Sequence, residues 1–157
     1  MEKKQRTLNN KGFSLIELIV VIAIMAILVG ALAPQYMKFV ERSRKSTDVQ
    51  NVAAIKSALE VYAADPMVAT ADALGTGSVK ITTTETPVSE TNASGNGNKA
   101  LAAAGISSLL LKSSKWPDAS SNITEYVLTY TVSPNGTVSF SETALKTGYS
   151  ILNGKYE

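Results

Sequence analysis

The feature that most constrains this chain is a long apolar run close to its N-terminus. Residues 13–33 form a run of 21 residues with only two polar side chains, Ser14 and Glu17. A helix of this length spans about 30 Å, which matches the hydrocarbon core of a bilayer. Residues 1–12 carry four basic side chains and one acidic one, and such a basic flank stays on the cytoplasmic side. The sequence therefore predicts a membrane-crossing helix with its leader inside the cell.

Two simple interpretations of this run leave Glu17 unexplained. The first interpretation is a secretory signal peptide, because residues 31–33 (Ala-Leu-Ala) are typical of a cleavage site. However, Pro34 follows directly and disfavours cleavage there. A plain membrane anchor is the other, with Glu17 near the interface. A carboxylate inside an apolar span costs at least a few kcal/mol and usually marks function.

Residues 12–24, GFSLIELIVVIAI, resemble the type IV prepilin signature, and the resemblance continues through Pro34. In that family a dedicated peptidase and methyltransferase cuts after the glycine on the cytoplasmic side and N-methylates the new terminal residue. By this match Gly12 precedes the cut, Phe13 is methylated, and Glu17 acts in subunit assembly. Cleavage at this position leaves the membrane helix on the mature protein.

The resemblance implies a structural subunit rather than an enzyme. The mature protein would cross the inner or cytoplasmic membrane once, with its globular domain outside, until the pilus assembly machinery adds it to an extracellular helical filament of identical subunits. Such filaments serve adhesion, motility, aggregation or DNA uptake. One alternative is a pseudopilin of a type II secretion or competence system, and another is a membrane-anchored binding domain unrelated to filaments.

The helix is expected to continue to Asp65, because Pro66 disfavours a helical residue before it. Its second half has apolar side chains at helical spacing, whereas Lys45, Asp48, Lys56 and Glu60 are placed largely on other faces. Three parts follow: a leader at 1–12, the membrane and filament-core half of the helix at 13–35, and a globular domain at 36–157. The apolar stripe is Val49, Val52, Ile55, Leu59 and Tyr62.

Gly30 and Pro34 mark a weak point in this helix, because a proline removes one backbone donor and crowds the carbonyl four residues earlier. The resemblance implies that this stretch loosens in the filament; a tolerated kink is the simpler interpretation. The cations that follow, among them Lys38, Arg42 and Arg44, are interpreted as a solvated helix face rather than a binding patch.

The remainder predicts a small antiparallel sheet. Alternating apolar residues at 126–132 and 138–140 flank Asn135-Gly136, which is typical of a hairpin. Residues 79–82 are expected to form a strand, 82–98 a loop, 100–111 a short helix and 148–152 a third strand of the sheet. Because an apolar sheet face must be covered, the helix stripe is expected to lie on it. The fold class is α+β and similar to pilins.

Composition excludes several kinds of site. The chain has no cysteine and no histidine, so disulfides, thiolate or imidazole catalysis and the usual zinc sites are ruled out. Many pilins carry a C-terminal disulfide loop, so the resemblance together with the absence of cysteine is consistent with the disulfide-free pilins of Gram-positive bacteria. No cofactor or calcium loop is expected, and residues 13–157 carry a net charge of −1 (11 basic against 12 acidic), which does not support nucleic acid as a partner. Trp116 is expected in the core, and three triplets beginning at Asn92, Asn122 and Asn135 fit the glycosylation pattern.

Overall fold

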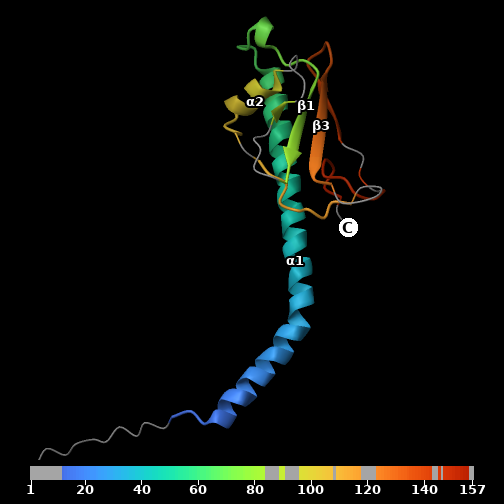
Figure 1. The fold of residues 1–157 in the computed structure, drawn as a ribbon. Helices are drawn as coiled ribbons and strands as arrows, with labels where there is room; N and C mark the ends of the chain where they lie inside the picture. The colour runs from blue at the N-terminus through green and yellow to red at the C-terminus, as the bar shows by residue number, and fades with distance from the viewer. Residues whose placement is uncertain are drawn as a thin grey trace, which may run out of the picture. The chain divides into compact units, whose positions relative to one another are not determined.

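The computed structural model describes residues 12–83, 89–90, 96–107, 109–117, 123–142, 145 and 147–155. Along the chain, the elements are α1 (Leu15–Ala64), a 3-10 turn (Thr70–Asp72), β1 (Gly77–Thr82), β2 (Ser89–Glu90), α2 (Gly97–Ala103), β3 (Glu125–Val132) and β4 (Val138–Glu142). They are drawn in Figure 1. The chain divides into two compact units, Met1–Phe39 and Val40–Glu157.

The predicted long helix is confirmed. α1 is 50 residues long and is helical through Pro34. It ends at Ala64, directly before Asp65-Pro66, as the sequence predicted. The Asp65 carboxylate then accepts a hydrogen bond of 2.8 Å from the backbone N–H of Met67, which turns the chain away from the helix axis.

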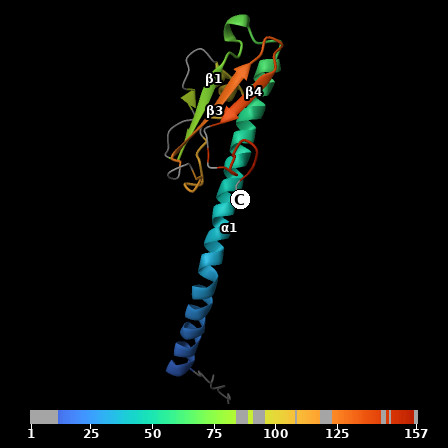
Figure 2. The same ribbon diagram turned by 90° about the vertical axis from the view of Figure 1, so that its right-hand side faces the viewer.

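A four-stranded antiparallel sheet has the order β2-β1-β3-β4. β1 pairs with β3 from Gly77↔Tyr130 to Thr82↔Glu125, and β3 pairs with β4 from Leu128↔Glu142 to Val132↔Val138. Figure 2 shows β1, β3 and β4 side by side. The predicted hairpin and first strand are therefore confirmed. The expectation of a loop throughout 82–98 was wrong at residues 89–90, where the short strand β2 pairs with β1, whereas residues 84–88 and 91–95 lie outside the described residues.

The turn between β3 and β4 explains the Asn135-Gly136 pair. Gly136 has φ +81°, a conformation that glycine adopts without strain. Its N–H donates to the Ser133 carbonyl at 2.8 Å, and the Ser133 N–H donates to Thr137 at 2.9 Å. These bonds close the hairpin and fix the register of the two strands.

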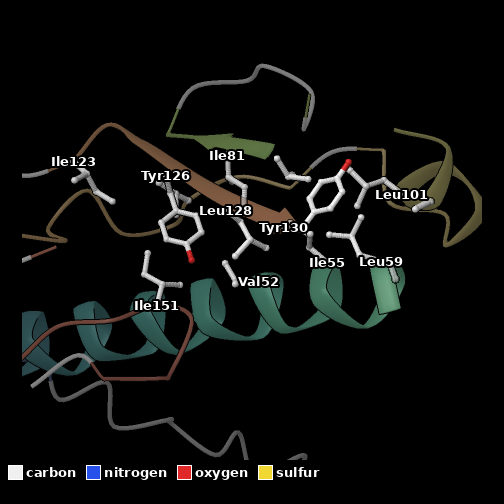
Figure 3. Close-up of a cluster of buried hydrophobic side chains, with 14 of the residues drawn as sticks. Val52, Ile55, Leu59, Ile81, Leu101, Ile123, Tyr126, Leu128, Tyr130 and Ile151 are labelled. Carbon is white, nitrogen blue, oxygen red and sulfur yellow. The ribbon is translucent and has the colours of Figure 1, made fainter. Parts of the chain in front are cut away.

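The core of the Val40–Glu157 unit lies between α1 and the sheet. Val52, Ile55 and Leu59 of α1 face Tyr126, Leu128 and Tyr130 of β3 (Figure 3), and all six are at most 1% exposed. The stripe of α1 thus covers the apolar face of the sheet, which confirms the α+β architecture. Trp116, as expected, also belongs to this core.

α2 is shorter than the helix predicted at 100–111, because Gly105 ends it. Gly105 has φ +71°, and its N–H donates to the Ala102 carbonyl at 3.0 Å. The Ile106 N–H donates to the Leu101 carbonyl at 2.8 Å. This pair of bonds is the Schellman arrangement, which satisfies the last helical carbonyls and stops the helix.

The third strand predicted at 148–152 was wrong. The segment folds back on itself, with Ser150 and Lys155 exchanging two backbone hydrogen bonds of 2.7 Å. Gly148 and Gly154 have φ +95° and +67°, which are incompatible with an extended strand. The turn nevertheless places Ile151 in the core with none of its surface exposed.

Candidate functional site

The first turn of α1 is capped by the acidic residue in the apolar run. The Ser14 carbonyl accepts the N–H of Leu18 at 3.2 Å, so Ser14 is the capping residue. The Ser14 N–H donates to Glu17 Oε2 at 2.8 Å. This contact is one half of a capping box, in which a glutamate three residues into the helix satisfies the amide of the capping residue. Glu17 therefore helps to begin α1 at Leu15.

The predicted cleavage bond joins Gly12 and Phe13, which lie before the helix. Both residues are exposed, and 89% of the Phe13 surface is accessible. A Cβ added to Gly12 would meet no atom within 4 Å. The chain's own packing therefore does not require glycine at this position. Cleavage between the two residues stays a prediction.

The helix that follows presents apolar side chains to its surroundings on every side. Its most apolar window of 18 residues has a mean hydropathy of 3.0, and none of it is buried. Length and composition therefore make this part of α1 able to cross a membrane. Its large exposed apolar residues are Leu15, Ile16, Leu18, Ile19, Val20, Val21, Ile22, Ile24, Met25, Ile27, Leu28, Val29, Leu32, Tyr36, Met37 and Phe39.

Gly30 and Pro34, the predicted weak point, lie within continuous helix. A Cβ on Gly30 would meet nothing within 4 Å, so no packing contact in the subunit requires glycine there. Pro34 has no N–H to donate to the Gly30 carbonyl. The helix is therefore one hydrogen bond short at this level, and its loosening in a filament stays a prediction.

A second carboxylate on α1 was missed by the sequence analysis. Asp48, expected on a face other than the apolar stripe, is 1% exposed. Its Oδ1 accepts the N–H of Lys112 at 2.6 Å, and its Oδ2 accepts the N–H of Ser113 at 3.0 Å and the Trp116 Nε1–H at 2.8 Å. Burial raises the pKa of Asp48, although these three donors oppose the change. The missed signal was its spacing, since position 48 lies four and seven residues before the buried Val52 and Ile55.

Asp48 and its neighbours on α1 hold one irregular segment, residues 109–117, which we call the strap. The Asn51 side-chain amide donates to the Leu110 carbonyl at 3.4 Å. Glu41 and the Ser113 hydroxyl form a further hydrogen bond. Three polar side chains of α1 therefore fasten the strap along the helix (Figure 1, amber segment beside α1).

Glu142 fastens the C-terminal turn in a similar way. Its carboxylate accepts the Tyr126 hydroxyl at 3.0 Å and the Leu152 N–H at 2.8 Å, and it also bonds the Ser150 hydroxyl. Burial and the adjacent carboxylate raise the pKa of Tyr126. In a chain without cysteine, hydrogen bonds to one carboxylate hold this turn to β4.

Only one of the three candidate glycosylation triplets begins within the described residues. Asn135 is exposed in the β3–β4 turn, and its Oδ1 accepts the N–H of Thr137 at 3.1 Å. This contact is the local turn chemistry expected for asparagine before glycine. Asn92 and Asn122 lie outside the described residues.

Comparison with known proteins is informative for the N-terminal third of the chain. Residues 7–33 match the family model of the prokaryotic N-terminal methylation motif. The chain is similar to a fimbrial protein of Pseudomonas aeruginosa, with 44% identity over 50 residues, covering 32% of each protein. It is also similar to prepilin peptidase-dependent protein A of Clostridium perfringens, with 43% identity over 58 residues, covering 36% of this chain and 41% of that protein.

A type IV major fimbrial protein FimA of Dichelobacter nodosus is 38% identical over 55 residues, covering 35% of each protein. These matches thus span about a third of the curated relatives' length, rising to 41% for the clostridial protein. No solved structure is significantly similar to this chain. The N-terminal third of the chain thus carries the methylation motif and is similar to the same part of type IV fimbrial proteins.

Proposed function

We propose that this protein is a structural subunit of a type IV pilus-like filament, assembled through the first half of α1. The observation that carries the proposal is the position of Glu17, a carboxylate that caps the helix and lies within a methylation motif, on an exposed and otherwise apolar stretch of helix. Apolar surface of this extent is stable only when lipid or protein covers it. Lipid would cover it before assembly, and the helices of neighbouring subunits would cover it afterwards.

Processing would supply the partner that Glu17 needs in the filament. Hydrolysis of the Gly12–Phe13 bond leaves a carboxylate on Gly12 and an amine on Phe13, and methylation of that amine preserves its positive charge. The Ser14 contact occupies one Glu17 oxygen, whereas a carboxylate accepts hydrogen bonds at both. In a bundle of helices, Glu17 of one subunit would meet the Phe13 amine of the next.

This pairing would set the axial register of the filament. The apolar side chains around Glu17 supply packing that has no preferred direction. An axial displacement would leave a carboxylate and an amine unpaired in an apolar core, which is strongly unfavourable. The charge pair therefore selects one position among many that the apolar surfaces alone would allow.

Glu17→Val should leave the protein produced, inserted and cleaved, but should sharply reduce the yield of filaments. Glu17→Asp should have a milder effect, because it keeps the charge on a shorter side chain. Glu60→Val is the matched control, since Glu60 is an exposed glutamate of α1 outside the apolar run. The measurement compares filaments sheared from cells, seen by electron microscopy, with mature protein retained in membranes. Normal filaments from Glu17→Val would refute this role for the charge.

Intact mass and N-terminal peptide spectrometry test the processing step independently. The mature chain is expected to begin at N-methylated Phe13. A mature chain that begins at Pro34 would instead show cleavage by a secretory signal peptidase, and one that keeps Met1 would show no cleavage at all.

A further inference from the structure

Three asparagines of this chain are each followed directly by glycine, a pair that can cyclise without any enzyme. The reaction begins when the backbone nitrogen of the glycine attacks the side-chain carbonyl carbon, Cγ, of the asparagine. Glycine permits this approach because it has no Cβ. The three pairs share the same two residues, so the fold decides which of them reacts. They are Asn96-Gly97, Asn135-Gly136 and Asn153-Gly154, and all lie within the described residues.

The cyclisation makes two demands on the side-chain amide of asparagine. Negative charge develops on Oδ1 as the ring closes, so an N–H donor already directed at that oxygen stabilises the transition state. The bond between Cγ and Nδ2 then breaks, and Nδ2 leaves as ammonia. Hydrogen bonds from Nδ2 to acceptors in the fold hold the amide in place and oppose this step. The favoured site therefore has a donor at Oδ1 and no acceptor at Nδ2.

Asn135 meets both conditions. Its Oδ1 accepts the backbone N–H of Thr137 at 3.1 Å. Its Nδ2 has no acceptor in the part of the chain that the structure describes. Asn135, Gly136 and Thr137 are all exposed in the β3–β4 turn. Hydroxide can therefore reach the amide proton of the glycine, and water can reach the ring that forms.

The amides of Asn96 and Asn153 are arranged in the opposite way. Asn96 Nδ2 donates to the carbonyl of Ala73 at 3.0 Å and to a second carbonyl at 3.4 Å, and Gly97 is buried. Asn153 Nδ2 donates to the Ser150 hydroxyl at 3.0 Å. Both side chains are thus held through the nitrogen that has to leave.

The backbone N–H of the attacking glycine does not favour Asn135. The Gly136 N–H donates to the Ser133 carbonyl at 2.8 Å, and the Gly154 N–H donates to the Ile151 carbonyl at 3.2 Å. Each bond has to open before the ring closes, and the shorter one belongs to Gly136. The inference therefore depends on the side-chain amide, where the two exposed pairs differ most.

We propose that Asn135 is the first site of deamidation in the folded protein. Hydroxide removes the proton of the Gly136 nitrogen, which bonds to Cγ of Asn135. The bond from Cγ to Nδ2 breaks, ammonia leaves with a proton from water, and a succinimide remains. One water molecule then opens the ring at either carbonyl, which gives aspartate or isoaspartate with no oxidation or reduction.

Both products add a carboxylate to the β3–β4 turn. Isoaspartate also lengthens the main chain between residues 135 and 136 by one carbon atom. This change falls between the two backbone hydrogen bonds that close the hairpin. Modified subunits therefore accumulate with the age of the protein and differ from new ones at this turn.

The test incubates the full chain in detergent at neutral and mildly alkaline pH, with a parallel sample unfolded in guanidinium chloride. Peptide mass spectrometry follows the three asparagines, and an isoaspartyl methyltransferase labels the isoaspartate. One hydrogen bond in an exposed site changes a rate by up to about tenfold. In the folded chain we expect Asn135 to react about tenfold faster than Asn153, and Asn96 to react no faster than Asn153. The three should react at similar rates in the unfolded chain.

A folded chain in which Asn96 or Asn153 reacts as fast as Asn135 would overturn the proposal. A glycan on Asn135, visible in the intact mass, would also overturn it, because the glycan occupies Nδ2. Neither measurement requires cleavage at Gly12 or filament formation, so the result is independent of the proposed function.

Thr137→Pro tests the donor directly, because proline has no N–H to offer to Oδ1. It should slow the reaction of Asn135 by about tenfold and leave Asn153 unchanged. Thr137→Ser is the matched control, since it keeps the N–H and should react as the unsubstituted chain does. An undiminished rate at Asn135 in folded Thr137→Pro would overturn the proposal. If circular dichroism shows that this variant misfolds, the comparison of the three asparagines in the unsubstituted chain decides the question.

Discussion

Leu28 and Leu59 lie on the same helix, yet their surroundings are opposite. Leu28 is 54% exposed, as are its apolar neighbours on every side of the helix, whereas Leu59 is fully buried between α1 and the sheet. The apolar stripe in the second half of α1 is covered by the sheet of the same chain. The first half leaves its apolar surface for another partner, so one helix serves two separate tasks.

Deleting residues 1–35 should have the largest effect, because it removes the exposed apolar half of α1 and leaves the buried half. The remaining residues, 36–157, keep the buried stripe of α1 and the whole sheet. We expect a soluble, mostly monomeric α+β protein that no longer associates with membranes. Circular dichroism, size exclusion and flotation with vesicles measure this.

Deleting only the leader, residues 1–12, is the control for that experiment, because the apolar run remains. This protein should stay in the membrane fraction. An unfolded or membrane-bound product from the longer deletion would contradict the division of tasks within α1.

Leu59→Ala and Leu28→Ala compare the two halves with one chemical change. Leu59→Ala should lower the free energy of unfolding by about 2 to 5 kcal/mol, because it leaves a cavity in the core. Leu28→Ala should change it by less than about 0.5 kcal/mol, as is usual for exposed positions. Unfolding of the full chain in detergent, followed by the fluorescence of its single tryptophan, Trp116, measures both. Equal losses would mean that the first half of α1 also stabilises the globular unit.

Asp48→Asn tests a polar contact of the second half of α1, with a smaller expected effect. An amide has one acceptor oxygen, so one of the three strap donors loses its partner, at a cost of about 1 to 3 kcal/mol. The pKa of Asp48 is raised in the folded state, so its contribution to stability is largest below its ordinary value of 3.8. That contribution is lost as the pH rises through the folded pKa.

The stability of the 36–157 protein relative to its Asp48→Asn variant should therefore fall as the pH rises from about 3 to neutrality. Urea unfolding of both proteins across this range gives the difference, in which groups common to the two cancel. A difference that grows with pH would mean that the three N–H donors outweigh burial at Asp48.

The sequence predicted the parts of this fold that have a periodic pattern of apolar residues. The apolar spacing of Val52, Ile55 and Leu59 indicated the helix, and alternation around Asn135-Gly136 indicated the hairpin. It did not predict the strap, whose position depends on backbone donors meeting Asp48 from 65 residues away. The turn at 148–155 was also missed, because apolar content there reflects one buried residue, Ile151, rather than a strand.

The candidate site was predictable to a different degree. Gly12, Phe13 and Glu17 form a continuous motif, so their proximity needs no knowledge of the fold. The hydrogen bond from Ser14 to Glu17 could also be expected from the three-residue spacing of a capping box. The contacts of Asp48 could not, since the strap meets α1 only in the folded chain.

The burial of the α1 stripe by strands that come later in the chain has a consequence for biosynthesis. α1 ends at residue 64, but the last strand that covers it is complete only at residue 142. Ribosomes add about 5 to 20 residues per second, so these 78 residues take about 4 to 16 s. During this interval the helix has an uncovered apolar stripe, and the nascent chain is most vulnerable to aggregation and proteolysis.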